Sequence, residues 1–149
     1  MIQIAPMTEE ALDYVLARLR KADADELRAA GLNHPRETFL RAARDASYTG
    51  VVLVNGEAAV IFGVNSIPDE DDVGLCWAVG TDQIHAEPFA AARASVRVVR
   101  QMRRQFSVLR NWVHCEHADA CRWLLWLGFD IDPQPVGPNG RFFAFSMGE

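Results

Sequence analysis

The sequence is poor in the features that mark secreted and membrane proteins. Its three cysteines, Cys76, Cys115 and Cys121, are odd in number and lie in apolar or helical surroundings. They do not form a disulfide framework, and they indicate a reducing compartment. No run approaches the roughly 18 apolar residues of a spanning helix, and the first residues lack a basic segment followed by an apolar one. We therefore expect neither export nor membrane insertion.

The chain also lacks an excess of basic charge. Its formal net charge is −5 over 149 residues, of which 50% are hydrophobic and 23% charged. This composition is typical of a globular protein and far from that of a disordered chain, so we expect one domain over residues 1–149. An acidic molecule has no overall attraction for nucleic acid or an anionic membrane, and we do not expect nucleic acid as a partner.

Apolar periodicity and turn residues predict the order of the elements. A short strand at 2–4 precedes a helix capped by Thr8, and two further helical patterns cover 22–30 and 36–46. Asn55-Gly56 separates two β-rich runs, 51–54 and 58–64, which is typical of a type I′ hairpin turn. The acidic run 69–72 is expected as a solvated loop before a third strand at 73–79. Helix, strand, helix and strand follow at 88–106, 108–115, 118–127 and 141–147.

The long helix expected at 88–106 has two different faces. A predicted core stripe consists of Ala92, Val96, Val99, Met102 and Phe106, and an opposite basic stripe of Arg93, Arg97, Arg100 and Arg104. The basic stripe is an interface candidate for an acidic protein surface, a nucleic-acid backbone or an acyl-carrier phosphate. The alternative, which we weight more heavily, is a face that only keeps the protein in solution.

This order of elements resembles the GNAT acyltransferase fold, and the resemblance implies an α+β domain with a mixed, mostly antiparallel sheet and helices on both faces. The segment 117–129 resembles the GNAT pattern Asn-x-x-Ala-x-x-x-Tyr-x-x-x-Gly-Phe through Ala120, Gly128 and Phe129. The chain is more closely similar to small internal virion proteins of short-tailed phages, a GNAT-like group. That likeness rests on Leu75-Cys76-Trp77-Ala78-Val79 running into Thr81-Asp82-Gln83, on Trp112-Val113, and on Asn139-Gly140-Arg141-Phe142.

The chain departs from the GNAT pattern where coenzyme A would be held. Such enzymes grip its pyrophosphate with a Gln/Arg-x-x-Gly-x-Gly/Ala loop, whose backbone N–H groups approach the phosphates. Here the loop reads Gln83-Ile84-His85-Ala86-Glu87-Pro88, with no glycine, an added negative charge and a proline that lacks an N–H. We therefore expect no cofactor, with acetyl-CoA as the alternative.

Catalytic candidates are weak. Leu124 occupies the place of the tyrosine that protonates the departing thiolate in many of these enzymes. His117 is a candidate proton donor, and Glu116 or the acidic run 69–72 a candidate base, but none of them is predicted as a catalytic residue. His114, Cys115, His117 and Cys121 lie within eight residues, yet the strand-to-helix break between them argues against a metal site.

The resemblance and the missing chemistry together favour a non-enzymatic phage protein. We expect it to act through protein–protein contacts in virion assembly or as a virion component, in the host cytoplasm and then in the virion. Its partners would be other virion proteins, through the basic stripe or through Trp123 and Trp126, and oligomerisation stays open. The alternative is an acyl-CoA-dependent N-acetyltransferase with an atypical pyrophosphate loop.

Overall fold

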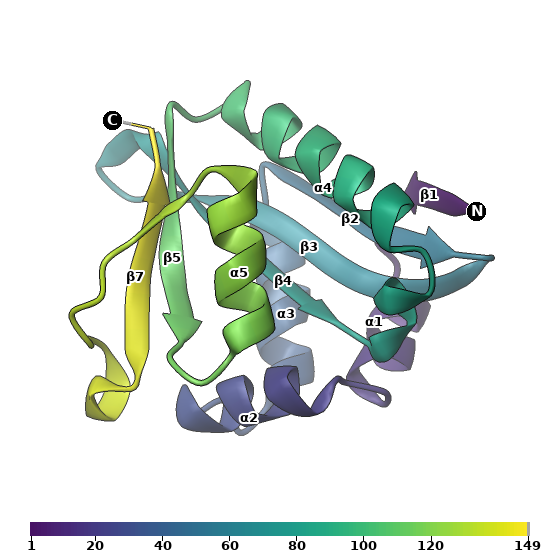
Figure 1. The fold of residues 1–149 in the computed structure, drawn as a ribbon. Helices are drawn as coiled ribbons and strands as arrows, with labels where there is room; N and C mark the ends of the chain where they lie inside the picture. The colour runs from purple at the N-terminus through teal and green to yellow at the C-terminus, as the bar shows by residue number, and fades with distance from the viewer. Residues whose placement is uncertain (149) are drawn as a thin grey trace.

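A seven-stranded sheet organises the computed structural model, which describes residues 1–148 (Figure 1). The strand order is β1-β2-β3-β4-β5-β7-β6, and all neighbours are antiparallel except the parallel pair β4 and β5. The strands are β1 (Ile2–Ala5), β2 (Tyr48–Val54), β3 (Glu57–Ile67), β4 (Glu70–Gly80), β5 (Val108–His114), β6 (Asp130–Ile131) and β7 (Phe142–Met147). The expected mixed, mostly antiparallel α+β architecture is confirmed.

Helices cover both faces of this sheet. They are α1 (Glu9–Leu16), α2 (Lys21–Ala29), α3 (Pro35–Asp45), α4 (Pro88–Arg103) and α5 (Ala118–Leu127), with 3₁₀ turns η1 (Asp82–Ala86) and η2 (Pro138–Gly140). In Figure 1, α4 and α5 lie in front of the sheet, α1 and α3 lie behind it, and α2 runs below. No helix in the described part of the chain is both long and apolar enough to cross a membrane.

Local capping and turn signals determine several element ends. Thr8 Oγ1 accepts the N–H of Ala11 at 3.1 Å, so α1 begins where its cap was predicted. Asn55 and Gly56 have φ values of 51° and 85°, the left-handed pair that a type I′ hairpin turn requires. Gly128 ends α5 at φ 103°, a conformation that costs glycine little.

Apolar residues of the central strands contribute to two hydrophobic cores, one on each face of the sheet. On β3, Phe62 and Val64 face the core under α4 and α5, whereas Ile61 faces the core under α1 and α3. Because successive side chains of a strand point to opposite faces, a strand covered on both sides is nearly continuously apolar. Of the helices, α2 lies at the end of the sheet where β4 and β5 finish.

Two local predictions are wrong. The acidic run is not a loop, because β4 already begins at Glu70 and pairs it with Ile67, which leaves only residues 68–69 as the turn. On α4 the fully buried positions are Ala91, Ala94, Val98 and Met102, so the predicted stripe is rotated by about one residue. Small alanines at 91 and 94 allow the helix to approach the sheet on that side. The two-residue strand β6 gave no periodic signal.

Candidate active site

β4 and β5 separate after only a short stretch of pairing. The parallel ladder joins Val73–Leu75 to Val108–Arg110 and then stops, and the two strands diverge toward their carboxyl ends (Figure 1). Asn111 lies at the fork: its Nδ2 donates to the Cys76 carbonyl at 2.8 Å, and its Oδ1 accepts the Trp112 N–H at 2.8 Å. This side chain replaces the ladder bonds that the separated strands no longer make.

Two carboxylates of α2 bridge the ends of the diverged strands. Asp23 Oδ2 accepts the N–H of Gly80, the last residue of β4, at 2.7 Å. Glu26 Oε2 accepts the N–H of His114, the last residue of β5, at 2.8 Å. Residues three apart on a helix share a face, so one face of α2 serves both strands. The opening between β4 and β5 is therefore crossed by α2.

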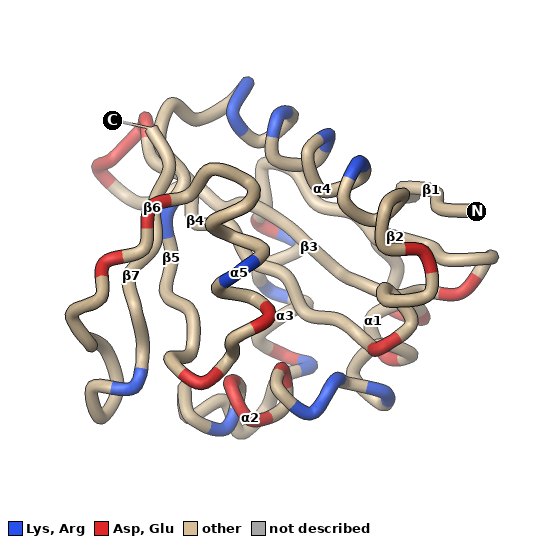
Figure 2. Tube along the Cα trace, in the orientation of Figure 1, with Lys and Arg blue, Asp and Glu red and all other residues tan. Residues whose placement is uncertain are grey.

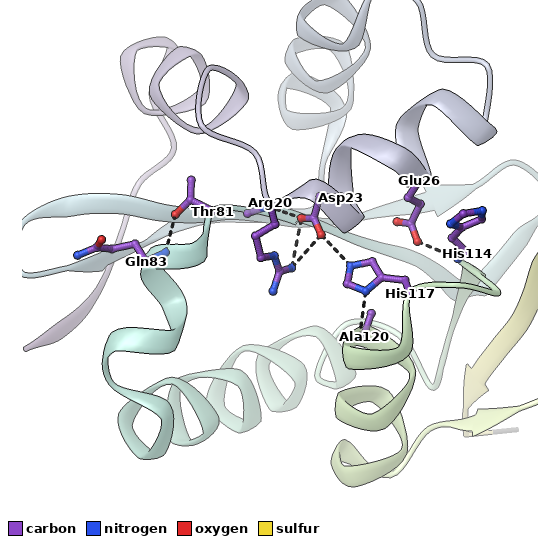
Figure 3. A network of polar contacts seen from close by, with 9 residues as sticks. Arg20, Asp23, Glu26, Thr81, Gln83, His114, His117 and Ala120 are labelled. Atoms are coloured by element: carbon purple, nitrogen blue, oxygen red, sulfur yellow. Dashed lines mark hydrogen bonds and ion pairs between the residues drawn. The ribbon is translucent and has the colours of Figure 1, made fainter.

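Asp23 is the centre of a buried polar network (Figure 3). Its Oδ1 lies 2.7 Å from Nε2 of His117 and 3.0 Å from Nη2 of Arg20, and the side chains of Asp23 and His117 are 6% and 4% exposed. The backbone N–H of Arg20 also donates to the Gly80 carbonyl at 3.0 Å. The network joins α2, the end of β4 and the start of α5.

The hydrogen bonds of His117 determine its tautomer. Its Nδ1 accepts the N–H of Ala120 at 3.2 Å, which caps the first turn of α5. An atom that accepts carries no proton, so the proton of the neutral ring is on Nε2 and is donated to Asp23. His117 is therefore held as a structural cap and donor, and its Nδ1 is not available to protonate a leaving group.

The two carboxylates of α2 have opposite pKa shifts. Burial by itself raises the pKa of Asp23, but hydrogen bonds from His117 and Gly80 and the charge of Arg20 outweigh it, so the pKa lies below its ordinary value. Burial raises the pKa of Glu26, and the N–H of His114 only partly opposes this. The pKa values of these two neighbouring acids are thus shifted apart, that of Asp23 downward and that of Glu26 upward.

A cavity of about 450 Å³ passes through the sheet at the opening between β4 and β5. On the side of α4 and α5 it is lined by Cys76, Ala78, Val98, Val113 and Leu124; on the side of α2 and α3 it is lined by Leu27, Phe39, Trp77, Trp112 and Phe142. Arg20, Asp23, Glu26, Asn111 and His117 line it as well. The volume is in the range of small-molecule sites, and apolar walls with few polar groups are typical of them.

The segment expected to hold a pyrophosphate does not form a phosphate cradle. Gln83 and Ala86 lie in the η1 turn, where Thr81 Oγ1 accepts the N–H of Gln83 at 3.2 Å, and Pro88 is the first residue of α4. The carboxylate of Glu87 stands at this helix start and pairs with the amino group of Met1 at 2.6 Å. The assignment of Gln83, Ala86 and Pro88 as a degenerate loop stays a prediction.

The other predicted catalytic candidates lie outside the cavity lining. The Glu116 side chain is 83% exposed and lies 3.9 Å from Nε2 of His114. The acidic run is at the start of β4, the opposite end of the strand from Gly80, and its Glu70 pairs with Arg110 at 2.8 Å. Neither group is placed to take a proton inside the cavity.

The basic stripe lies on the exposed side of α4, away from the opening (Figure 2). Arg93, Arg97, Arg100 and Arg104 are all exposed, and the last three border a separate hollow of about 410 Å³ over Ile4 and Tyr48. On α5, Trp123 is half-buried and lines the cavity, whereas Trp126 is 61% exposed. Their roles as interface residues remain predictions.

The Cys and His residues are not gathered into a metal site. Within residues 1–148 no group of three His, Cys, Asp or Glu side chains is arranged to hold a metal ion. Burial raises the pKa of the Cys76 thiol to about 12, so this cavity-lining cysteine is not a nucleophile at neutral pH. Burial, followed by the proximity of Cys115 and Glu26, also raises the pKa of Cys121.

Sequence reasoning missed the four polar residues that shape the opening, Arg20, Asp23, Glu26 and Asn111. A signal existed for two of them: Asp23 and Glu26 lie on one face of a helix whose apolar stripe is weak, so that face needed polar partners in the fold. Asn111 precedes Trp112 and Val113 in β5, and nothing in this segment signals that its side chain would be needed at the fork.

Comparison with known proteins identifies solved structures that share this fold. Neither a protein-family model nor a curated protein sequence matches this chain. Among solved structures, ribosomal-protein-S18-alanine N-acetyltransferase from Escherichia coli is similar at 15% identity and a TM-score of 0.67, covering 99% of this chain and 92% of that one. PaiA N-acetyltransferase from Thermoplasma acidophilum, in complex with coenzyme A, is similar at 10% identity and a TM-score of 0.69, covering 100% and 99%.

A third similar structure extends the same likeness. N-acetylglutamate synthase from Neisseria gonorrhoeae, complexed with coenzyme A and N-acetylglutamate, has 14% identity and a TM-score of 0.68, covering 99% of this chain and 35% of that one. These neighbours are acetyltransferases and two hold coenzyme A, so the expectation of a non-enzymatic virion protein without a cofactor is wrong. The likeness to phage internal virion proteins has no support. At these identities the comparison shows the fold alone, and this chain has the GNAT acetyltransferase fold.

Proposed function

We propose that this protein is an acyl-CoA-dependent N-acyltransferase, with its reaction site in the opening between β4 and β5. The observation that carries the proposal is the cavity that passes through the sheet there, apolar on the side of α4 and α5 and flanked by carboxylates on the side of α2. Two reactants can thus enter from opposite faces and meet between the strands. Holding reactants together in this way is itself a large part of catalysis.

The side of α4 and α5 suits the pantetheine arm of the donor. Cys76, Ala78 and Gly80 share one parity on β4, and the Cys76 carbonyl and both backbone groups of Gly80 point away from β3 toward the opening. Alternation along a strand directs the N–H and C=O of Ala78 the same way, so a slender amide-bearing arm finds backbone partners there. When bound, acyl-coenzyme A supplies the activated acyl group.

The diphosphate end of coenzyme A has no backbone cradle in this chain, because Glu87 and Pro88 occupy the start of α4. Arg20 offers a different contact. Its guanidinium lines the cavity at the end of β4, its side chain is only 15% exposed, and its Nε has no hydrogen-bond partner among the described residues. A phosphate oxygen is a suitable acceptor for such a group.

The proposal is tested by thermal unfolding with and without acetyl-CoA. A ligand at 100 times its dissociation constant adds about 2.7 kcal/mol to the free energy of unfolding. Ala78→Phe would fill the channel from an exposed edge position and should abolish the shift, whereas Ala118→Phe, exposed at the start of α5 and outside the cavity lining, should leave it intact. Absence of a shift at millimolar acetyl-CoA would overturn the proposed function.

A further inference from the structure

We propose that the acyl acceptor is a primary amine attached to a small aromatic body, and that Glu26 receives its ammonium group and then its proton. This inference rests on the proposed function and names the substrate class of the same site. It follows from the part of the cavity that faces α2 and α3, whose lining includes four aromatic rings and a carboxylate that still has a free oxygen.

Four rings from four different elements line this side of the cavity. Phe39 of α3 and Trp77 of β4 have their ring centroids 5.5 Å apart, and Trp112 of β5 and Phe142 of β7 are 6.2 Å apart. Aromatic rings bind another ring through offset or edge contacts. A peptide or a polyamine would have to leave several polar groups unpaired against these walls, which is unfavourable. The walls therefore favour an acceptor with one polar group.

Glu26 is the carboxylate available to that polar group. The two oxygens of Asp23 already accept from Gly80, His117 and Arg20. Glu26 Oε2 accepts from His114, and Oε1 has no hydrogen-bond partner within residues 1–148. An ammonium group needs such an acceptor when it leaves water.

The surroundings of Glu26 suit proton transfer. The titratable groups that face it are Asp23 on its own helix, His114 at the end of β5, and His117 and Cys121 of the α5 region. Burial and the Asp23 charge favour its protonated form, so the carboxylate is a stronger base than an exposed one. A bound ammonium would keep Glu26 ionised until the proton moves.

The transfer balances with Glu26 and solvent. One proton of the bound ammonium passes to Glu26 Oε1, and the freed nitrogen lone pair forms the C–N bond with the acyl carbon. The nitrogen loses its second proton to solvent as the C–S bond breaks, and the electron pair of that bond leaves with the thiol sulfur. Among the described residues that line the cavity there is no tyrosine, so that sulfur takes its proton from solvent.

Acceptor binding is measured first, by titration calorimetry without any donor. 2-Phenylethylamine should bind at least about 10-fold more tightly than ethylamine, which lacks the ring, and than 2-phenylethanol, which lacks the charge. Spermidine and a short peptide with an N-terminal alanine should bind more weakly than 2-phenylethylamine. Trp112→Ala removes a half-exposed side chain from the cavity wall. It should weaken the binding of 2-phenylethylamine and leave the binding of ethylamine unchanged.

Catalysis is measured next, as thiol release from acetyl-CoA. Glu26→Gln should lower kcat by about 100-fold or more, KM for 2-phenylethylamine should rise because the ammonium group loses its counter-charge, and the acid limb of the pH profile should disappear. Glu26→Asp should restore part of the rate. Asp25→Asn is the matched control, because Asp25 is the neighbouring acid of α2 but pairs with Lys21 outside the cavity.

The outcomes separate the two proposals. If acetyl-CoA stabilises the protein but the peptide or spermidine binds more tightly than 2-phenylethylamine, the inferred acceptor class is wrong and the proposed function stands. An unchanged pH profile in folded Glu26→Gln removes Glu26 as the base. If Glu26→Gln does not fold, the Trp112→Ala binding series and the wild-type pH profile still decide the inference. Failure of acetyl-CoA to bind at all contradicts the proposed function itself.

Discussion

Nε2 of His117 lies 2.7 Å from Oδ1 of Asp23, and this buried contact joins α5 to α2 across the opening between two diverged strands. The residues are 94 positions apart in the sequence. Each has further partners, Gly80 and Arg20 for Asp23 and the Ala120 N–H for His117. The contact therefore determines how far the ends of β4 and β5 stand apart, and with it the shape of the cavity.

Loss of the Asp23 carboxylate should destabilise the fold strongly. Asp23→Ala leaves the Gly80 N–H, the His117 Nε2–H and the Arg20 guanidinium without their common acceptor, and removing one partner of a buried ionic set typically costs about 3–5 kcal/mol. Urea denaturation at pH 7 measures the change. Asp25→Ala removes only the surface ion pairs with Lys21 and Arg28 and should change stability much less; equal effects of the two variants would show that the network is not important.

Stability should depend on pH through Glu26 in a direction opposite to that of an ordinary carboxyl. Its pKa in the folded protein is raised, so its contribution is fully present below its ordinary value of 4.5 and is lost as pH rises through the folded pKa. Glu26→Gln removes this loss and keeps an oxygen for the His114 N–H. The variant should gain stability relative to wild type as pH rises above 4.5, measured by urea unfolding. A difference that does not change with pH would contradict the burial of Glu26.

Acid should weaken the fold through Asp23. The pKa of Asp23 is lowered in the folded protein, so its contribution is present above its ordinary value of 3.8 and is lost as pH falls through the folded pKa. Unfolding followed by circular dichroism from pH 5 downward should show a loss of stability below about pH 4 that is smaller in Asp23→Asn. A parallel loss in both proteins would assign acid unfolding to other carboxylates.

The turn between β2 and β3 should tolerate asparagine but not valine at Gly56. The residue has φ 85° and its added Cβ would meet no atom within 4 Å, so any cost comes from backbone conformation and not from a clash. Gly56→Val should lower the free energy of unfolding by about 1 kcal/mol or more, and Gly56→Asn by less. Urea denaturation of both variants tests this, and an unchanged midpoint for valine would contradict the type I′ turn.

The basic stripe of α4 should be unimportant for folding. Arg97 and Arg100 are exposed, so their joint replacement by glutamate should change the free energy of unfolding by no more than about 0.5 kcal/mol per site.

The same replacement should raise the pKa of Tyr48. Burial raises this pKa and the charge of Arg97 lowers it, so loss of that charge should raise it further. Ultraviolet titration of the phenol measures this shift, and a fall in the Tyr48 pKa would contradict the placement of Arg97.

The sequence by itself determined the elements whose signals are local. Thr8 caps α1, Asn55-Gly56 makes the hairpin turn, and Gly128 ends α5, because each depends on a side chain or a φ angle within a few residues. Alternation and helical periodicity then gave the order of elements and the fold class. The predicted limits of the turn after β3 and the predicted buried face of α4 were less exact. Both depend on the elements that pack against these segments.

Only the tertiary structure decided where the site lies. No local pattern in the sequence indicates that Asp23 contacts His117 or that Glu26 contacts His114, because the partners are 88 or more residues apart. Their contacts arise only when α2 crosses the ends of β4 and β5. The weak sequence candidates Glu116 and the acidic run were chosen for their chemistry, and the fold exposes them to solvent. Burial and hydrogen bonding, which lower the pKa of Asp23 and raise that of Glu26, belong to the assembled sheet and not to any segment of the chain.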